Sequence, residues 1–444
     1  MMELAYLLVA VVLIIVLTTR FRVHPFIALL VISIGYGFIS GMPYATIVNA
    51  INGGFGNTLG KVGLIIFLGV IIGAFLEQTG GAFAIAEKVL ALIGKKRVTA
   101  AMGIIGYVVS IPVFADSGFL LLHPLNKSLS KKAKLSLAGT AVALGLGLLA
   151  THTLVPPTPG PIAAAGIIGA DLGLVIGFGI PVSLVALFMA ILFARKYASR
   201  TYIDPQGGKE KEPTAVPISQ RPGALRASIP ILVPILLIIL KSVINPEGSE
   251  GDSVLLSLIA FMGEPVIALL IGVFLCLLLP KKITYEMLST SGWVGKAVKD
   301  AASIVLITGA GGIFGQILQD SGIATTLGAT LSSWNIGIML PFVLAAALKT
   351  AQGSSTVALI TTASILMPMM GTLGFESEVQ KALVVLSIGA GSSVISHAND
   401  SFFWVVTQLS GMEVNNGYRL FSLGTFVLGF SAALAVFILY QFLG

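Results

Sequence analysis

Apolar runs close to 20 residues long recur along the whole of this 444-residue chain. A helix of about 20 apolar residues is long enough to span the hydrocarbon core of a bilayer. Charged residues make up 10% of the sequence, whereas a soluble domain covers its surface with about 25%. These features exclude a water-soluble fold and predict an all-α polytopic membrane protein.

Eight segments are plain candidates for membrane crossings, because each is apolar, close to the required length and bounded by charge, glycine or proline. The first of them lacks a preceding basic region and a following small-residue cleavage site, so we predict an uncleaved membrane helix rather than a signal peptide. The eight segments are residues 3–19, 24–41, 61–77, 172–194, 228–244, 254–279, 301–318 and 418–443.

Four further segments do not have the length of one crossing. Residues 98–130 and 336–371 are each too long for one crossing, too short for two and polar at the middle, which predicts re-entrant helical hairpins. Residues 135–170 are interrupted by a proline-rich run, and residues 381–412 by Ser-His-Ala-Asn-Asp-Ser, so we predict two broken helices. Non-helical backbone at membrane depth must be buried in protein or line a wet cavity, so the tips and breaks should meet inside the protein.

The order of crossing, amphipathic stretch, hairpin, broken crossing and crossing occurs twice, which predicts a first repeat over residues 1–195 and a second over 228–444. Five crossings per repeat, an odd number, would invert the second copy. Inverted repeats with discontinuous helices are typical of secondary transporters, whose sites lie near the bilayer midplane. Four positions of one repeat align without gaps on four of the other: Gly69, Gly73, Leu76 and Gly80 on Gly311, Gly315, Leu318 and Gly322.

The basic residues predict the orientation. With five crossings per repeat, all but four of the 26 lysines and arginines fall on one side, which the positive-inside rule makes cytoplasmic. Both termini should then be extracytoplasmic, and the first hairpin should enter from the cytoplasm. The polar stretch 196–227 is predicted to be a cytoplasmic linker. The net charge of +7 is therefore an orientation signal, and we expect no nucleic-acid partner.

The tips and breaks should bring several helix N-termini to mid-depth, where unpaired N–H groups and the helix dipole form an anion site without arginine. Small hydroxyls and glycines there suit a ligand with carboxylate or hydroxyl oxygens, although each hydroxyl is equally suited to capping a broken helix or joining neighbouring helices. The predicted substrate-binding residues are Ser117, Gly118, Thr153, Pro157, Thr158, Gln352, Gly353, Ser354, Ser355, Thr356, His397 and Asn399.

Three charges fall near the predicted midplane, where a charge is costly and points to function. Asp116, at the first tip, is the first candidate for the proton-coupling group, and Asp400, in the second break, is the other. Either aspartate would also serve as a helix N-cap. Lys349 would pair with the substrate carboxylate or balance an internal aspartate.

Other chemistries find little support. The single cysteine, Cys276, excludes an intrachain disulfide, and no His or Cys spacing matches a transition-metal site, so we expect no metal and no cofactor. An intramembrane aspartyl hydrolase using Asp116 and Asp400 is a remote alternative, because the GxGD signature of such enzymes is missing. We therefore predict a transporter rather than an enzyme.

Three polar motifs, at residues 156–161, 351–358 and 396–404, resemble the gluconate permease (GntP) family of proton symporters, and shorter similarities extend the likeness over nearly the whole chain. The resemblance implies proton-coupled uptake of small hydroxy carboxylates, such as gluconate or a related sugar acid. It also implies a multi-pass protein of the bacterial inner membrane, membership of the ion-transporter superfamily, a homodimer, and scaffold and transport domains that move as an elevator.

Three positions depart from the family pattern. Gluconate carriers commonly have Tyr-Glu-Val-Gly-Phe where this chain has residues 115–119, histidine where it has Thr158 and arginine where it has Lys349. A glycerate or D-serine carrier is therefore an alternative, as is a sodium-coupled carboxylate symporter, because hydroxyls and carbonyls at hairpin tips also suit a hard cation.

Overall fold

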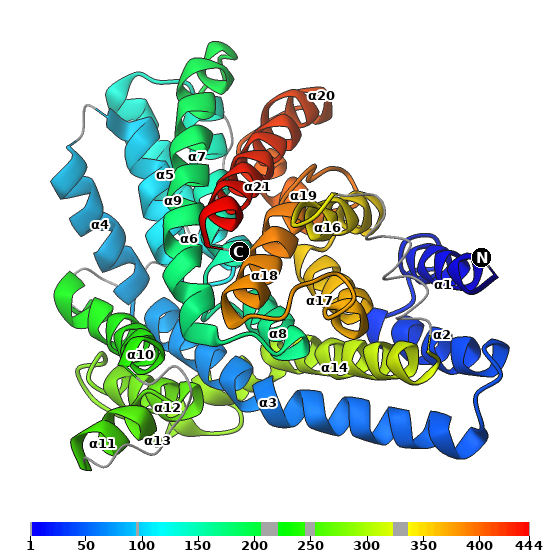
Figure 1. Cartoon of the computed structure of the whole chain (residues 1–444). Helices are drawn as coiled ribbons and strands as arrows, with labels where there is room; N and C mark the ends of the chain where they lie inside the picture. Colours follow the sequence, from blue (N-terminus) through cyan, green and yellow to red (C-terminus); the bar gives the residue numbers. More distant parts are fainter. Residues whose placement is uncertain (1, 95–96, 206–220, 245–253, 323–335, 444) are drawn as a thin grey trace.

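The computed structural model describes residues 2–94, 97–205, 221–244, 254–322 and 336–443 of the chain. Within these ranges the regular elements are all helices (Figure 1). Six of the described helical segments are long and apolar enough to cross a membrane, and one bent pair of helices would make a seventh. The predicted all-α polytopic membrane class is therefore confirmed.

The described residues of the first part of the chain form a series of helices. They are α1 (Met2–Thr19), α2 (Pro25–Ile39), α3 (Tyr44–Gln78), α4 (Gly81–Ile93), α5 (Val98–Val109), α6 (Ala115–Ala133), α7 (Leu137–Leu154), α8 (Pro159–Ile168) and α9 (Leu172–Lys196).

The second part follows a comparable order. Its helices are α10 (Ala224–Ile244), α11 (Val254–Met262), α12 (Pro265–Cys276), α13 (Tyr285–Leu288), α14 (Trp293–Asp320), α16 (Met339–Gln352), α17 (Ser355–Leu366), α18 (Glu378–Ser392), α19 (Ser401–Leu409), α20 (Val414–Asn416) and α21 (Leu423–Leu443). Most of the predicted linker, and the second amphipathic stretch at 323–335, lie outside the described residues.

The helices are interrupted at the four predicted places. The chain leaves helical geometry between α5 and α6, between α7 and α8, between α16 and α17, and between α18 and α19. Prolines explain the second interruption, because proline lacks the amide hydrogen that a continuous helix needs. In the last, Ile395 has a left-handed φ of 46°, which a β-branched residue rarely adopts outside a functional site.

The glycine row of α3 supports the first tip and the first break. A Cβ on Gly73 would lie 2.0 Å from the carbonyl oxygen of Pro112, and one on Gly69 would lie 3.0 Å from that of Pro157. The aligned glycines of α14 receive α17 instead: a Cβ on Gly311 would lie 2.8 Å from the Ser364 hydroxyl. Glycine is needed at these positions because the neighbouring segment, irregular backbone beside α3 and helix α17 beside α14, comes too close to leave room for a Cβ.

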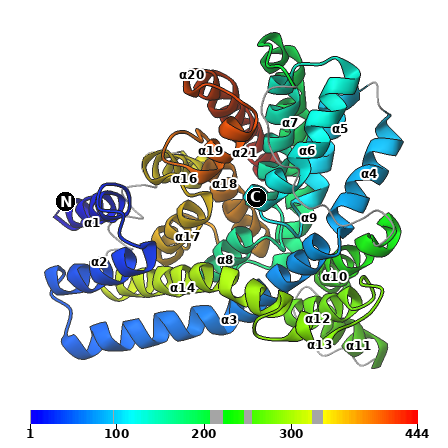
Figure 2. The same ribbon diagram turned by 180° about the vertical axis from the view of Figure 1, so that it is seen from behind.

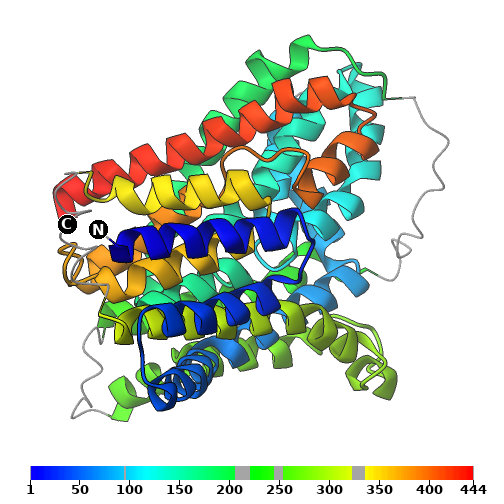
Figure 3. The same ribbon diagram turned by 90° about the vertical axis from the view of Figure 1, so that its right-hand side faces the viewer.

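Helices α3 and α14 form a long pair along one edge of the molecule (Figures 1 and 2). Helices α7 and α18 lie in the interior of the molecule. A Cβ on Gly54 of α3 would lie 2.6 Å from the carbonyl oxygen of Gly312, so the two helix backbones nearly touch. Every residue of α7 except His152 is buried. The chain-terminal ends of α1 and α21 lie on the same side of the molecule (Figure 3).

Two predicted spans have the wrong bounds. Helix α3 begins at Tyr44 rather than near residue 61, because packing against α14 overrides the low helix propensity of the asparagines and glycines in 44–60. The segment 254–279 is not one plain span: α11 and α12 meet at an angle of 70°. Pro265 begins α12, where a missing amide hydrogen is tolerated, so the earlier helix ends before it.

Candidate functional site

One cavity, of about 250 Å³, lies where the two predicted tips and the second break meet. The N-terminal ends of α6, α17 and α19 face it, together with the C-terminal end of α16 and the last part of α7. Its lining residues are Ala115, Asp116, Leu149, His152, Gln352, Gly353, Ser354, Ser355, Thr356, Asn399, Asp400, Ser401 and Phe402.

Three helix N-termini direct their partial positive charges toward this cavity, whose lining contains no lysine or arginine among the described residues. Side chains cap two of these ends. The Ser354 hydroxyl accepts a hydrogen bond from the amide of Val357 at 3.3 Å, and the Asp400 carboxylate accepts one from the amide of Phe402 at 3.0 Å. The amides of the first residues of α17 have no partner within the helix, so an anion in the cavity is a suitable acceptor.

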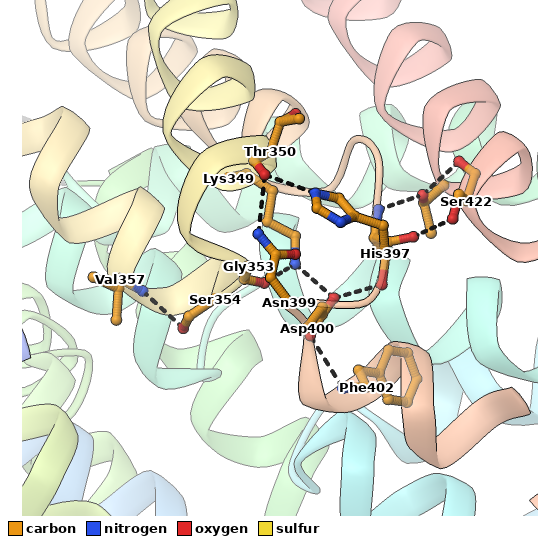
Figure 4. Close-up of polar contacts among 12 residues, drawn as sticks. Lys349, Thr350, Gly353, Ser354, Val357, His397, Asn399, Asp400, Phe402 and Ser422 are labelled. Atoms are coloured by element: carbon orange, nitrogen blue, oxygen red, sulfur yellow. Dashed lines mark hydrogen bonds and ion pairs between the residues drawn. The ribbon is translucent and has the colours of Figure 1, made fainter. Parts of the chain in front are cut away.

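The Asp400 carboxylate is held by two further donors (Figure 4). The Lys349 ammonium lies 2.6 Å from its Oδ2, and the hydroxyl of Ser396 donates to the same oxygen. Lys349 also donates to the carbonyl oxygen of Gly353, at the second tip. Lys349 is fully buried and is not among the residues that line the cavity, so its charge is balanced within the protein.

The second break also caps the C-terminal end of α16 (Figure 4). The His397 ring donates from Nε2 to the carbonyl of Thr350 at 2.7 Å, and the Asn399 amide donates to the carbonyls of Thr350 and Ala351. Gly353 ends α16 with a left-handed φ of 91°, and a Cβ there would lie 2.2 Å from the carbonyl oxygen of Asn399. The tip and the break therefore form one closely packed unit.

Three buried polar atoms of the lining residues have no hydrogen-bond partner in the described part of the chain. They are Oδ1 of Asp116, Nε2 of Gln352 and Nδ1 of His152. Buried polar groups are normally paired, so unpaired groups around a cavity indicate bound water or a ligand. The set includes an acceptor and a donor, which suits a ligand that carries both kinds of polar group.

The predicted site residues divide into those that lie at or next to the cavity and those that lie elsewhere. Eight of them line the cavity: Asp116, Gln352, Gly353, Ser354, Ser355, Thr356, Asn399 and Asp400. Lys349 lies directly behind Asp400, and His397 lies against α16.

The others lie elsewhere. The hydroxyl of Thr153 donates to the carbonyl of Leu149, and that of Thr158 to the carbonyl of Val155, so both hydroxyls satisfy the broken helix. Pro157 and Thr158 line a separate small space of about 10 Å³ beside Gly69. Ser117 is outside the cavity lining, and Gly118 packs closely against Leu148.

Sequence reasoning missed several lining residues. Leu149, Ser401 and Phe402 line the cavity although they had no predicted role, and Ser396 holds Asp400 from within a recognised motif. The sequence offered one indication of these residues, which is their position close to a helix break. Within the described ranges, no three His, Cys, Asp or Glu residues are grouped so as to hold a metal ion.

Helices interrupted around a buried polar cavity, in a multi-pass membrane fold, define a membrane transporter. A family model described as GntP family permease matches residues 2–443, and the chain therefore belongs to this family. Its similarity to named permeases and transporters makes it a transporter and not an enzyme, so the hydrolase alternative is withdrawn.

The curated relatives are similar over nearly their whole length. The inner membrane permease YgbN of Escherichia coli is 33% identical, covering 96% of both chains. The gluconate permease of Pseudomonas aeruginosa is 34% identical, covering 93% of this chain and 92% of its own. The D-serine transporter DsdX of Escherichia coli is 32% identical, covering 98% and 97%. The chain is thus a multi-pass inner-membrane protein.

The fold also resembles solved transporter structures. The YdaH transporter of Alcanivorax borkumensis superimposes with a TM-score of 0.64 over 88% of both chains, at 13% sequence identity. MtrF of Neisseria gonorrhoeae gives a TM-score of 0.60 over 88% of this chain and 84% of its own, at 12% identity. At these identities the likeness concerns the fold alone.

Proposed function

We propose that this permease takes up small hydroxy carboxylates, such as gluconate or a related sugar acid, together with protons. The observation that carries the proposal is the central cavity, where three helix N-termini meet the unpaired oxygen of Asp116. Its volume of about 250 Å³ is slightly below the range of about 300–1,000 Å³ typical of drug-sized ligands. The cavity therefore suits a molecule with few carbon atoms.

The electrostatics favour an anion. The cavity lining contains no lysine or arginine among the described residues, and the buried charge of Lys349 is balanced by Asp400. Positive potential then comes from the ends of α6, α17 and α19, which offer amide hydrogens to carboxylate oxygens. The hydroxyls of Ser355 and Thr356 would add hydrogen bonds to a carboxylate or hydroxyl group.

Asp116 supports coupling to protons. Ionised, its carboxylate would repel a bound carboxylate in the same cavity and could only accept hydrogen bonds. Protonated, the same group would be neutral and would donate one. Proton binding and anion binding therefore reinforce each other, and this reciprocal linkage is the thermodynamic requirement for symport.

Sodium coupling is the alternative that the geometry favours less. A sodium ion needs free oxygen ligands, such as the carbonyls at a hairpin tip. At the second tip the carbonyls of Thr350, Ala351 and Gly353 already accept hydrogen bonds from His397, Asn399 and Lys349. A cation there would have to displace these donors.

The substrate belongs to a narrow class. Two relatives are named gluconate permease and one is named a D-serine transporter. Gluconate and D-serine are both small acids that carry a hydroxyl group. Glycerate and D-serine remain the alternatives to gluconate, because Ala115–Phe119, Thr158 and Lys349 depart from the motifs of gluconate carriers.

The architecture of the transport cycle is part of the proposal. We infer two inverted repeats, 1–195 and 228–444, with both termini outside the cytoplasm, and an elevator motion of a transport domain in a homodimer. The similar helix order of the two parts supports the repeat, as do the left-handed φ angles of the aligned Gly80 and Gly322, 73° and 76°.

Uptake into proteoliposomes would test the coupling. We expect the purified permease to accumulate gluconate, glycerate or D-serine when the outside is made acidic, with or without sodium. Accumulation that requires sodium and is indifferent to the pH gradient would refute proton coupling. A permease that exchanges none of the three acids would refute the substrate class.

A further inference from the structure

A second group of buried polar side chains lies away from the cavity, along α6. His123 is 2% exposed, and neither of its ring nitrogens has a partner at hydrogen-bond geometry within the described residues, although the ring lies close to the backbone of Leu409. The side-chain nitrogen of Asn126 and the hydroxyl of Ser410 are also buried and unpaired in this part of the chain. A buried polar group without a partner is unfavourable, because it has lost its hydrogen bonds to water. Three such residues together therefore indicate ordered water.

These groups are neighbours. Asn126 follows His123 by three residues on α6, and the backbone of Leu409, next to Ser410, faces the His123 ring. The hydroxyl of Ser130 is 3.5 Å from the side-chain oxygen of Asn126. We call His123, Asn126, Ser130 and Ser410 the α6 polar cluster.

The α6 polar cluster lies between the cavity and the basic end of α6. Asp116 precedes His123 by seven residues, which places the two on the same side of the helix, about 10 Å apart along its axis. The Phe119 ring stacks on His123 with centroids 5.6 Å apart and meets Phe402, a cavity residue, at 6.2 Å. Beyond the cluster, α6 continues to Lys131 and Lys132, at the end proposed to face the cytoplasm.

We propose that the α6 polar cluster holds water and conducts protons between Asp116 and the cytoplasmic end of α6. This inference rests on the proposed proton coupling. A neutral imidazole accepts a proton on one nitrogen and releases one from the other, so the proton leaves the Asp116 carboxyl group, which becomes a carboxylate, and ends on water. His123 stays neutral but in its other tautomer, and a flip of the ring restores the first one. Movement of the Phe119 ring would connect the cluster to the cavity.

Few other titratable groups face the cluster. On α6 itself, Lys127 is the nearest charge to His123. Helix α19 carries no titratable residue, and α7 carries only His152, which lies at the cavity. On α5, the hydroxyl of Tyr107 is 2.8 Å from that of Ser183, on α9. His123 is thus the titratable side chain of α6 that lies between Asp116 and Lys127.

Two measurements on proteoliposomes separate proton conduction from substrate binding. Counterflow exchanges labelled substrate without net proton movement, whereas a pH dye inside the vesicles reports the protons that enter with substrate. The probe is whichever of gluconate, glycerate and D-serine the wild type exchanges. The variant His123→Phe keeps a planar aromatic ring, somewhat larger than imidazole, and removes both nitrogens. The same substitution at an exposed histidine bonded to Ser303, His24→Phe, is the control.

We expect His123→Phe to retain counterflow while the rate of substrate-driven acidification falls by about a hundredfold or more, the scale of a lost proton-transfer group. Added imidazole, a diffusible proton carrier, should restore part of the acidification. Ser410→Ala should lower it less, and His24→Phe should behave as the wild type.

Three results would overturn the inference. Normal acidification by His123→Phe would show that the α6 polar cluster is not in the proton path and would leave the proposed function intact. An equal loss of counterflow and acidification in His123→Phe, His123→Gln and Ser410→Ala would assign the cluster a structural role. A wild type that exchanges substrate without acidification, or exchanges none of the three acids, would refute the proposed function and the inference together.

Discussion

The ammonium nitrogen of Lys349 lies 2.6 Å from Oδ2 of Asp400, and both side chains are almost completely shielded from solvent. Through this pair the second hairpin tip is bound to the second helix break. Because the two charges cancel, the ionisation of the other titratable lining residues, Asp116 and His152, determines the net side-chain charge close to the cavity.

Breaking this pair should destabilise the protein. We expect Lys349→Met to cost about 3–5 kcal/mol, because Asp400 would be left as a buried charge without its counter-ion. Adding Asp400→Asn should recover part of the loss. Lys381→Met, which removes an exposed pair with Glu378, should cost only about 0.3–0.5 kcal/mol. Thermal unfolding of the purified variants measures these differences, and equal shifts for Lys349→Met and Lys381→Met would contradict the prediction.

A methyl group at Gly353 should disrupt the site. Gly353→Ala places a Cβ 2.2 Å from the carbonyl oxygen of Asn399 in a left-handed conformation, so the tip must move away from the break. Gly374→Ala is the control, since its φ of 78° carries a similar backbone penalty of about 1–2 kcal/mol and its Cβ would meet open space. We expect Gly353→Ala to lose at least about tenfold in transport rate, the effect of a misplacement near 1 Å at a site. Counterflow measures the rate, and a similar loss in both variants would argue against a special role for this contact.

Much of the helix order could be predicted because interruptions have a clear chemical cause. Proline and polar runs within apolar segments identified the breaks near 155–161 and 396–401, and the helices end there. The aligned Leu76 and Leu318 are both buried, and Gly80 and Gly322 both end a helix with positive φ. Such local signals are visible in one sequence.

Pairings between distant segments could not be predicted in the same way. The sequence left Lys349 with three candidate partners, and only the packing of α16 against α18 and the following break places it beside Asp400. The role of the Thr158 hydroxyl could also be assigned only from the structure, because a threonine at a helix break can either bind a ligand or cap the helix. The first half of α3 was missed because contact with α14, rather than local propensity, stabilises it.

Neutralising Asp116 should separate exchange from accumulation. For one proton per substrate, each pH unit of gradient is worth about 1.4 kcal/mol, which corresponds to tenfold accumulation in the wild type. We expect Asp116→Asn to retain counterflow but to show no accumulation driven by the pH gradient, since asparagine cannot release a proton. Asp320→Asn, at an exposed aspartate bonded to Gln316, is the control. Undiminished accumulation by Asp116→Asn would exclude this residue as the coupling group.

Two hydroxyls near the broken helices should have opposite effects. Ser355 lines the cavity at the start of α17, so Ser355→Ala should remove a hydrogen bond to substrate worth about 0.5–1.5 kcal/mol and raise KM accordingly, with little change in Tm. The buried Thr158 instead donates to the carbonyl of Val155 within the break, so Thr158→Val should lower Tm and leave KM nearly unchanged. Initial uptake rates and thermal unfolding distinguish the two. If Thr158→Val raised KM more than Ser355→Ala, the ligand would have to contact the first break rather than the cavity assigned to it, and the space of about 10 Å³ beside Pro157 would have to widen to admit it.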